Sequence, residues 1–348
     1  MQKKEIKAVD FFCSGGGMTK GMTQAGIKVL AGIDNDPKCK ETYEVNNKGS
    51  KFVLADVYNL EEKELKKQLA LKKNDDNLLF IGCSPCQFWT ITRTDKKKSE
   101  QSKSLLKEFN RFVKYFNPGY VVVENVPGIA SRKKESGLTD FIDDLEGKGY
   151  KVKYENVNLN DYGVPQTRKR FTLIATRVNK DSIFPKPSRK KRPTVKDFIG
   201  KNKGFPEVNA GYRDKSWFQH TAAALSAKNL QRLTGTPPNC GDSGWWRTDK
   251  ELGRLKYRGE SFKDIYGRMS WDKPAPTITT KFFSLSNGRF GHPEENRAIS
   301  LREGATLQTF PRRYKFLTQS IEQAGKLIGN AVPPEYAKKI GKAIINSK

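Results

Sequence analysis

Two cysteines stand three positions apart in the segment Cys83-Ser84-Pro85-Cys86, a spacing known from zinc sites, redox pairs and catalytic thiols. A zinc site needs a second pair of ligands, and neither the two histidines nor Cys240 lies in a ligand-spaced pair. A redox pair belongs to a small thioredoxin-like unit, which this chain is not. Two interpretations stay open: one cysteine is a nucleophile on a turn, or the thiols are buried beneath a loop.

A glycine turn, residues 14–17, offers a second kind of chemistry. It lacks the Gly-x-Gly-x-x-Gly spacing that brings a helix N-terminus against pyrophosphate, which weakens a dinucleotide interpretation. A glycine-rich turn still lets the backbone approach a ligand, and the carboxylate of Asp34 stands where it can accept both ribose hydroxyls. Both facts fit a nucleoside without phosphates. The alternative is a tight turn, with Asp34 as a helix cap before Pro37.

Apolar segments that alternate with helix-like segments must position these residues. The strand-like segments are 6–12, 29–33, 52–54, 78–81 and 120–123. Continuous apolar strands of this kind imply a parallel sheet covered on both faces. Ligands of such sheets bind at the carboxyl ends of the strands, where the glycines, acids and cysteines of this chain fall.

The chain of 348 residues is long enough for two domains, and its composition changes near residue 180. A basic, proline-rich linker at 184–193 is followed by a stretch rich in Gly, Pro, Trp and Asn. We therefore expect a first domain at 1–180, an irregular domain with few helices at 181–300, and a segment at 301–348. The end of that segment is helix-like and could return to pack on the first domain.

The charge balance predicts a polyanionic partner. Lys and Arg number 65 against 38 Asp and Glu, a formal net charge of +27. A hydrophobic fraction of 36% with 11% aromatic residues predicts a folded protein rather than a disordered basic tail. The chain has no apolar run near the roughly 20 residues that span a bilayer, and no signal peptide is recognisable. Five cysteines do not suggest a disulfide framework, so we expect a cytoplasmic chain with free thiols.

Six blocks of sequence, taken in order, resemble the motifs of the C5-cytosine DNA methyltransferases, and the prokaryotic type II modification enzymes in particular. The blocks are Asp10-Phe11-Phe12, Pro85-Cys86-Gln87, Glu124-Asn125-Val126-Pro127-Gly128, Gln166-Thr167-Arg168-Lys169-Arg170, residues 302–311 and Gly329-Asn330-Ala331-Val332-Pro333-Pro334. The resemblance implies a Rossmann-like, doubly wound, mostly parallel sheet, the fold of S-adenosylmethionine-dependent methyltransferases. Residues 1–180 would be the catalytic domain and 181–300 a smaller, irregular target-recognition domain, while 301–348 would carry further motifs.

The resemblance also implies a covalent mechanism for methylation of cytosine C5. Cys86 would add to C6 of the base, and Glu124, at the end of a very apolar strand, would supply a proton or strong hydrogen bond at N3. Arg170 would hold O2 of the base, and Arg168 would support the thiolate. Because a stacked base cannot reach a side chain, the target cytosine must be flipped out of the duplex.

S-adenosylmethionine is the cofactor that the resemblance implies. Phe12 would stack on the adenine, Asp34 would hold the ribose, Asp56 would accept from the adenine amino group, and Asn330 with Val332 would line the methionine end. The remaining predicted cofactor contacts are Ser14, Gly15, Gly16, Gly17 and Asn35. No metal is expected. Ser14 departs from the family pattern, since many relatives have glycine at that position. Ser84 and the pair Trp89-Thr90 also depart from the pattern.

Double-stranded DNA is the predicted partner. The residues expected to contact it are Gln87, Arg93, Lys96, Lys97, Arg213, Gln219 and Arg247. We expect a monomer associated with the nucleoid, within a restriction-modification system whose endonuclease would act on the same site without forming a stable complex. Two alternatives stay open: a tRNA cytosine-5 methyltransferase on the same fold, and a non-catalytic DNA-binding relative. A binder would not need a nucleophile and an acid together.

Overall fold

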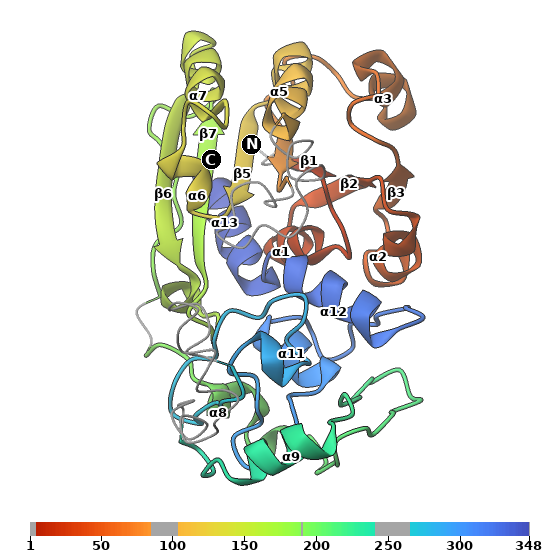
Figure 1. Ribbon diagram of the computed structural model, residues 1–348. Coiled ribbons are helices and arrows are strands. Elements are labelled where there is room, and N and C mark those ends of the chain that lie inside the picture. The colour runs from red at the N-terminus through yellow and green to blue at the C-terminus, as the bar shows by residue number, and fades with distance from the viewer. Residues whose placement is uncertain (1–4, 85–103, 189–190, 241–264, 348) are drawn as a thin grey trace. The chain divides into compact units, whose positions relative to one another are not determined.

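The computed structural model describes residues 5–84, 104–188, 191–240 and 265–347 (Figure 1). By contacts between residues the chain divides into two compact units. The first unit holds residues 1–158, 169–187 and 332–348, and the second holds 159–168 and 188–331. The boundaries predicted near residues 180 and 300 divide the chain by function, into catalytic and target-recognition regions. That division stays a prediction.

A seven-stranded sheet forms the centre of the first unit, in the order β3-β2-β1-β4-β5-β7-β6. The first five strands along this order are parallel, and β7 runs antiparallel to β5 and β6. The predicted mostly parallel, doubly wound sheet is therefore confirmed. The strands are β1 (Lys7–Phe11), β2 (Lys28–Asp34), β3 (Lys51–Leu54), β4 (Leu78–Gly82), β5 (Tyr120–Asn125), β6 (Lys151–Asn158) and β7 (Lys169–Thr176).

Aromatic packing covers one face of the sheet. The rings of Phe109 and Phe112 on α5 lie 5.3 and 5.1 Å from that of Phe11 on β1. Phe80 on β4 lies 5.3 Å from Phe11 in an edge-to-face contact, a geometry that aromatic pairs prefer. Gly82 at the end of β4 leaves room for this helix, since a Cβ there would lie 2.8 Å from the Phe109 ring. Besides α5 (Leu105–Phe116), the elements near this sheet are η1 (Pro37–Cys39), α2 (Lys40–Asn46), α3 (Glu62–Leu69), α6 (Gly128–Ser131) and α7 (Leu138–Gly147).

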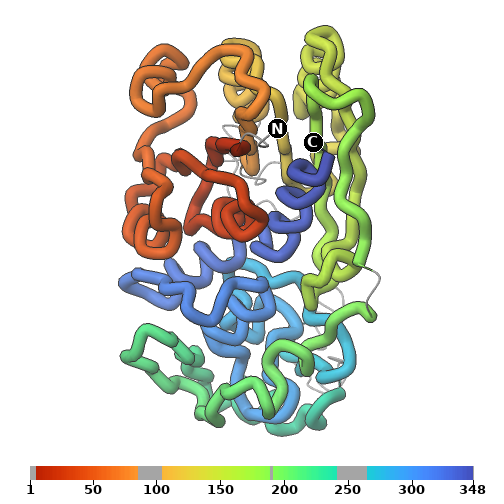
Figure 2. Tube along the Cα trace, turned by 180° about the vertical axis from the view of Figure 1, so that it is seen from behind, coloured from red at the N-terminus to blue at the C-terminus, as the bar shows by residue number. Residues whose placement is uncertain are grey.

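Two helices from opposite ends of the chain, α1 (Gly17–Ala25) and α13 (Pro334–Asn346), pack against each other (Figures 1 and 2). Their close approach requires glycine at position 21, because a Cβ there would lie 2.3 Å from the carbonyl oxygen of Pro334. The hydroxyl of Tyr336 on α13 lies 2.7 Å from that of Thr172 on β7. The C-terminal helix is thus part of the first unit.

The second unit has an irregular architecture of short helices and loops. Its described elements are η2 (Leu159–Tyr162), α8 (Val195–Ile199), η3 (Lys201–Lys203), α9 (Ala227–Thr234), η7 (Leu285–Asn287), α11 (Leu301–Leu307) and α12 (Ile321–Asn330). Three arginines, Arg268, Arg297 and Arg302, are among its largest fully buried side chains. Arg268 donates to the backbone carbonyls of Leu233 and Thr236 at the end of α9. Buried guanidinium groups thus satisfy the polar backbone of these loops.

Candidate active site

Three neighbouring strands bring an aromatic ring and two carboxylates to one edge of the sheet. Phe12 follows β1, Asp34 ends β2, and Asp56 lies just beyond β3. The three strands are parallel neighbours, so their carboxyl ends lie at the same edge. Phe12 has φ 63°, a left-handed backbone that is uncommon for a large side chain. All three side chains are half-buried, which leaves each partly open to a ligand.

Backbone N–H groups orient the carboxylate of Asp34. The N–H of Ser14 donates to Oδ2 at 2.8 Å, and that of Asp36 donates to Oδ1 at 3.0 Å. Burial raises the pKa of Asp34, and these hydrogen bonds oppose that rise. Ser14 itself has φ 46°, so a residue with a Cβ occupies a conformation that favours glycine. Asn35, the next predicted contact, is exposed.

A buried chain of hydroxyl groups lies behind the glycine turn, and the sequence analysis did not find it. Thr19 on α1 donates from Oγ1 to Asp10 Oδ2 at 2.6 Å. The same oxygen lies 3.1 Å from the hydroxyl of Tyr43, which lies 2.7 Å from that of Ser50. Burial raises the pKa of Asp10 to about 7, with Thr19 opposing the rise and Asp34 adding to it. The feature of the sequence that could have revealed this chain of hydroxyl groups is Asp10, an acid inside an apolar strand.

An ion pair lies at the carboxyl end of β5. Arg170 Nε lies 3.1 Å from Glu124 Oε1, and both side chains are largely buried, at 13% and 8% exposed. Glu124 is on β5 and Arg170 is the second residue of the antiparallel strand β7. The structure therefore brings together the two side chains predicted to hold N3 and O2 of a cytosine. A carboxyl group with an adjacent guanidinium is suited to a base edge with a ring nitrogen beside a carbonyl oxygen.

Asn125 links the end of β5 to the turn after β4. Its Nδ2 lies 3.2 Å from both the carbonyl oxygen and the hydroxyl of Ser84.

Burial raises the pKa of the neighbouring Cys83 thiol well above its usual value, and Glu124 adds to the rise. Cys83 is therefore held as an unreactive thiol. The predicted nucleophile Cys86 lies outside the described residues, as do the predicted DNA contacts Gln87, Arg93, Lys96, Lys97 and Arg247.

The other predicted site residues have the following environments. Gly15, Gly16 and Gly17 are buried, as is Val332, whereas Asn330 is exposed. Arg168 is 2% exposed, and its terminal nitrogens donate to backbone carbonyls of the second unit.

The two described residues predicted to read DNA differ in their surroundings. Arg213 is exposed. The amide of Gln219 donates to the carbonyl of Phe316 at 2.6 Å and accepts from its N–H at 3.2 Å. Gln219 would have to leave this partner to contact a base, whereas Arg213 is already accessible.

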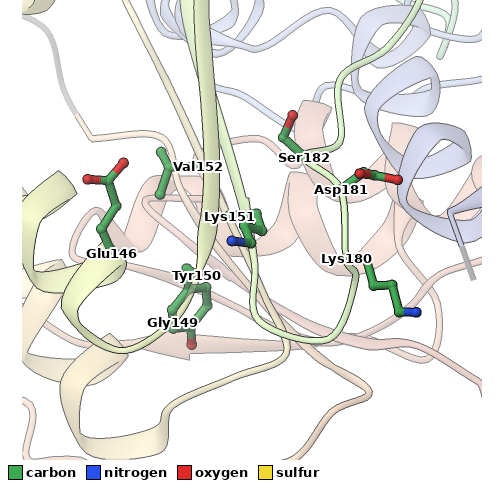
Figure 3. A pocket seen from close by; sticks show the side chains of 8 residues that line it. All are labelled: Glu146, Gly149, Tyr150, Lys151, Val152, Lys180, Asp181 and Ser182. Atoms are coloured by element: carbon green, nitrogen blue, oxygen red, sulfur yellow. The ribbon is translucent and has the colours of Figure 1, made fainter.

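A polar hollow at another part of the first unit contains none of the predicted site residues (Figure 3). It is lined by Glu146, Gly149, Tyr150, Lys151, Val152, Lys180, Asp181 and Ser182. Of these, the Tyr150 hydroxyl already donates to the carbonyl of Pro118 at 2.5 Å. The hollow adjoins the start of β6, not the carboxyl ends of β1 to β5.

One group of metal-binding residue types, His292, Glu295 and Glu303, occurs in the part of the chain that the structure describes. His292 Nδ1 accepts the N–H of Glu295 at 2.9 Å, so the proton of a neutral ring lies on Nε2, the nitrogen that faces the two carboxylates. Arg297 donates to both oxygens of Glu303, at 2.7 and 2.9 Å. These contacts describe a hydrogen-bonded ion-pair network rather than a set of free metal ligands.

The helices of the described residues include none that is both long and apolar enough to cross a membrane.

This sheet order, with groups suited to a nucleoside at β1 to β3 and an acid–arginine pair at β5, defines the class of S-adenosylmethionine-dependent methyltransferases. The model of the C-5 cytosine-specific DNA methylase family matches residues 6–346, and the chain belongs to this family. The predictions of family and of DNA cytosine-5 methyltransferase activity are thereby confirmed.

Two curated relatives are type II enzymes. The type II methylase M.HgiDII of Herpetosiphon aurantiacus is 38% identical over 343 residues, which cover 97% of this chain and 94% of the relative. The type II methyltransferase M1.HphI of Haemophilus parahaemolyticus is 31% identical, over 97% of this chain and 86% of that protein.

A solved structure, the methyltransferase EhMeth of Entamoeba histolytica, shares the fold at a TM-score of 0.67 with 14% identity, covering 99% of each chain. Dnmt2 of S. pombe shares it at a TM-score of 0.62 with 18% identity, over 98% of this chain and 97% of the other.

Proposed function

We propose that this chain transfers a methyl group to C5 of a cytosine flipped out of double-stranded DNA, with Cys86 as the nucleophile. S-adenosylmethionine, when bound, supplies the methyl group from its sulfonium. The proposal extends the family assignment to particular residues and to a particular polymer. Its main support among the described residues is the buried pair of Glu124 and Arg170.

The residues present fit S-adenosylmethionine by their chemistry. The ring of Phe12 offers a face to adenine, and Asp34 offers a carboxylate, held by two backbone N–H groups, to the ribose hydroxyls. The carboxylate of Asp56 can accept from the exocyclic amine of adenine. Asn330 and Val332 are proposed to hold the methionine end, and Ser14 to Gly17 allow close backbone approach.

In the proposed reaction the thiolate of Cys86 adds to C6 of the cytosine, and the C5=C6 double bond opens to make C5 nucleophilic. Glu124 donates to N3 as negative charge develops on the ring, and Arg170 donates to O2. After C5 gains the methyl group, a base removes the C5 proton. The C5=C6 bond re-forms as the Cys86 sulfur leaves and N3 returns its proton to Glu124, so the enzyme is regenerated.

The substrate polymer is tested by methyl transfer. The protein is incubated with S-adenosylmethionine carrying a labelled methyl group, together with either duplex DNA or tRNA. We expect label in DNA only, and bisulfite sequencing would then locate the methylated cytosine and its recognition site. Label in tRNA alone would overturn the choice of DNA.

The nucleophile is tested with a matched pair of cysteine variants. Cys86→Ala should abolish methyl transfer and leave duplex binding intact, because phosphate contacts provide most of the affinity. Cys83→Ala should stay active, since the pKa of the Cys83 thiol is raised well above its usual value and this thiol is a poor nucleophile. A duplex with 5-fluorocytosine at the target should form a denaturation-resistant adduct at Cys86, because fluorine at C5 blocks the elimination step. An active Cys86→Ala enzyme would refute the assignment.

We further propose a role beside a restriction endonuclease that recognises the same DNA site, because two relatives with high coverage are named type II enzymes. Expression of the chain in a host should then protect the host DNA from one restriction specificity. Unprotected DNA that nevertheless carries methylated cytosine would argue against this role. The monomeric state and the cytoplasmic location stay predictions.

A further inference from the structure

We propose that Gln166, Arg168 and Gln308 form a positioning cluster that fixes the backbone on both sides of Asn330 for binding of the cofactor. The inference rests on the proposed function, because it concerns the residue assigned to the methionine end of S-adenosylmethionine. For Arg168 we thus propose positioning as its role, in place of the support of the Cys86 thiolate that the family resemblance implies. All four residues belong to the second unit.

The three cluster side chains are buried, at 0%, 2% and 0% exposed. Gln166 Nε2 donates to the carbonyl of Leu307 and to Gln308 Oε1, each at 2.7 Å. Gln166 Oε1 accepts the N–H of Ile278 at 2.9 Å. The Gln166 amide is therefore used fully, and it joins three segments that are distant in the sequence.

The cluster provides the C-terminal cap of α12. The last carbonyls of a helix have no donor within the helix. After Asn330 the C-cap residue of α12 is Ala331 in an extended conformation, rather than a left-handed glycine. Arg168 donates to the carbonyls of Gly329 and Ala331 at 3.1 and 3.3 Å. Gln308 donates to those of Ile328 and Ala331 at 2.8 and 3.1 Å. The cationic guanidinium also lies at the negative end of the helix dipole, where a positive charge is favourable.

The helix end also packs directly against another segment of backbone. A Cβ at Gly329 would lie 2.4 Å from the carbonyl carbon of Thr279, so this part of α12 lies directly against backbone. Arg168 holds that layer too, through a hydrogen bond of 2.9 Å to the carbonyl of Ile278. Asn330 is exposed although the carbonyls of both its neighbours are held. The arrangement fixes the backbone and leaves one amide side chain available to a ligand.

These contacts also distinguish two roles for Arg168. Both terminal nitrogens of its guanidinium already donate to carbonyls, so a movement of this group would uncap α12. A lysine could keep the positive charge but could not reproduce the planar fork that serves three carbonyls. Arg168→Lys therefore retains the electrostatic role and removes the positioning role.

The test measures cofactor binding separately from chemistry, on the full chain. S-adenosylhomocysteine is titrated by calorimetry without DNA, and adduct formation on 5-fluorocytosine duplex is followed at saturating S-adenosylmethionine. We expect Arg168→Lys and Gln308→Met each to weaken S-adenosylhomocysteine binding by about 10-fold, as for the loss of about one net hydrogen bond. The adduct rate at saturating S-adenosylmethionine should stay within about 3-fold of the parent rate. This change is smaller than the loss of one net hydrogen bond would cause.

Arg268→Lys is the matched control, because Arg268 is another buried arginine of the second unit that donates to the last carbonyls of a helix. It should lower the melting temperature as Arg168→Lys does, without weakening S-adenosylhomocysteine binding. Asn330→Ala should weaken that binding, and adding Arg168→Lys to it should weaken binding by less than the product of the two single effects.

The opposite results would overturn the inference. Unchanged S-adenosylhomocysteine affinity in Arg168→Lys, whatever its adduct rate, would refute the positioning role of this residue. Fully additive effects of Arg168→Lys and Asn330→Ala would also contradict positioning. A parent protein that binds S-adenosylhomocysteine but methylates no cytosine would refute the proposed function alone, and the binding measurements would still decide the role of the cluster.

Discussion

Asp10 should make the folded protein less stable as pH rises, and Asp10→Asn should remove that effect. Burial raises the pKa of this carboxyl from 3.8 to about 7. Between these values the folded chain keeps a proton that the unfolded chain releases, so the free energy of unfolding falls with increasing pH. At about 1.4 kcal/mol per pKa unit, the full shift corresponds to about 4 kcal/mol, reached above pH 7.

The assay is urea unfolding of parent and variant across the same pH range. Asp10→Asn cannot ionise, so its stability relative to the parent should increase by about 3 kcal/mol between pH 5 and pH 8. Oδ1 of Asp10 has no hydrogen-bond partner among the described residues, and the new amide would leave a donor unpaired there. That cost is the same at every pH, so the change in the difference reports Asp10 alone. A constant difference across the range would show that the pKa of Asp10 in the folded chain is not raised above its value in the unfolded chain.

Four further predictions concern packing, charge and recognition. Glu303→Gln should lower the free energy of unfolding at neutral pH by about 2–3 kcal/mol in urea titrations, because it removes one of the two carboxylates that pair with the buried Arg297. Arg297 outweighs burial and lowers the pKa of Glu303 to about 2, so this contribution should fade as pH falls below about 4.5. Thr309→Gly should raise the free energy of unfolding by about 1 kcal/mol, since a β-branched residue has φ 66° there. Gly21→Ala should lower the melting temperature by forcing α1 from α13. Exchange of residues 181–300 with a relative should transfer the methylated site, as mapped by bisulfite sequencing, and a chimera that methylates the parental site would refute this.

The sequence was sufficient to predict the strands of the sheet that are buried on both faces. β5 is buried throughout, so Tyr120 to Val123 stand out as an apolar run, and the acid that follows marks its functional end. β6 escaped prediction because most of its residues are exposed at the sheet edge. The antiparallel direction of β7 leaves no pattern in its own residues, since it depends on the path of the chain between strands.

The site residues also divide into those whose positions the sequence could predict and those whose partners it could not. Asp34 could be placed because a carboxylate at the end of a parallel strand has one location in such a fold. The pairing of Glu124 with Arg170 required the register between β5 and β7, and the neighbours of Arg168 required the packing of α12. A family motif identifies which residues matter, but it does not say whether an arginine contacts a substrate or caps a helix.

The mutual packing of α1 and α13 has a consequence for how the protein is made. The first unit is assembled from three stretches of chain, and the last of them, 332–348, follows the whole second unit. During translation the face of α1 around Gly21 therefore stays uncovered until α13 has left the ribosome. Such long-range closure is slow compared with local folding, and it exposes apolar surface to chaperones in the meantime. Completion of the α1 face, next to the glycine turn, is thus tied to the synthesis of α13.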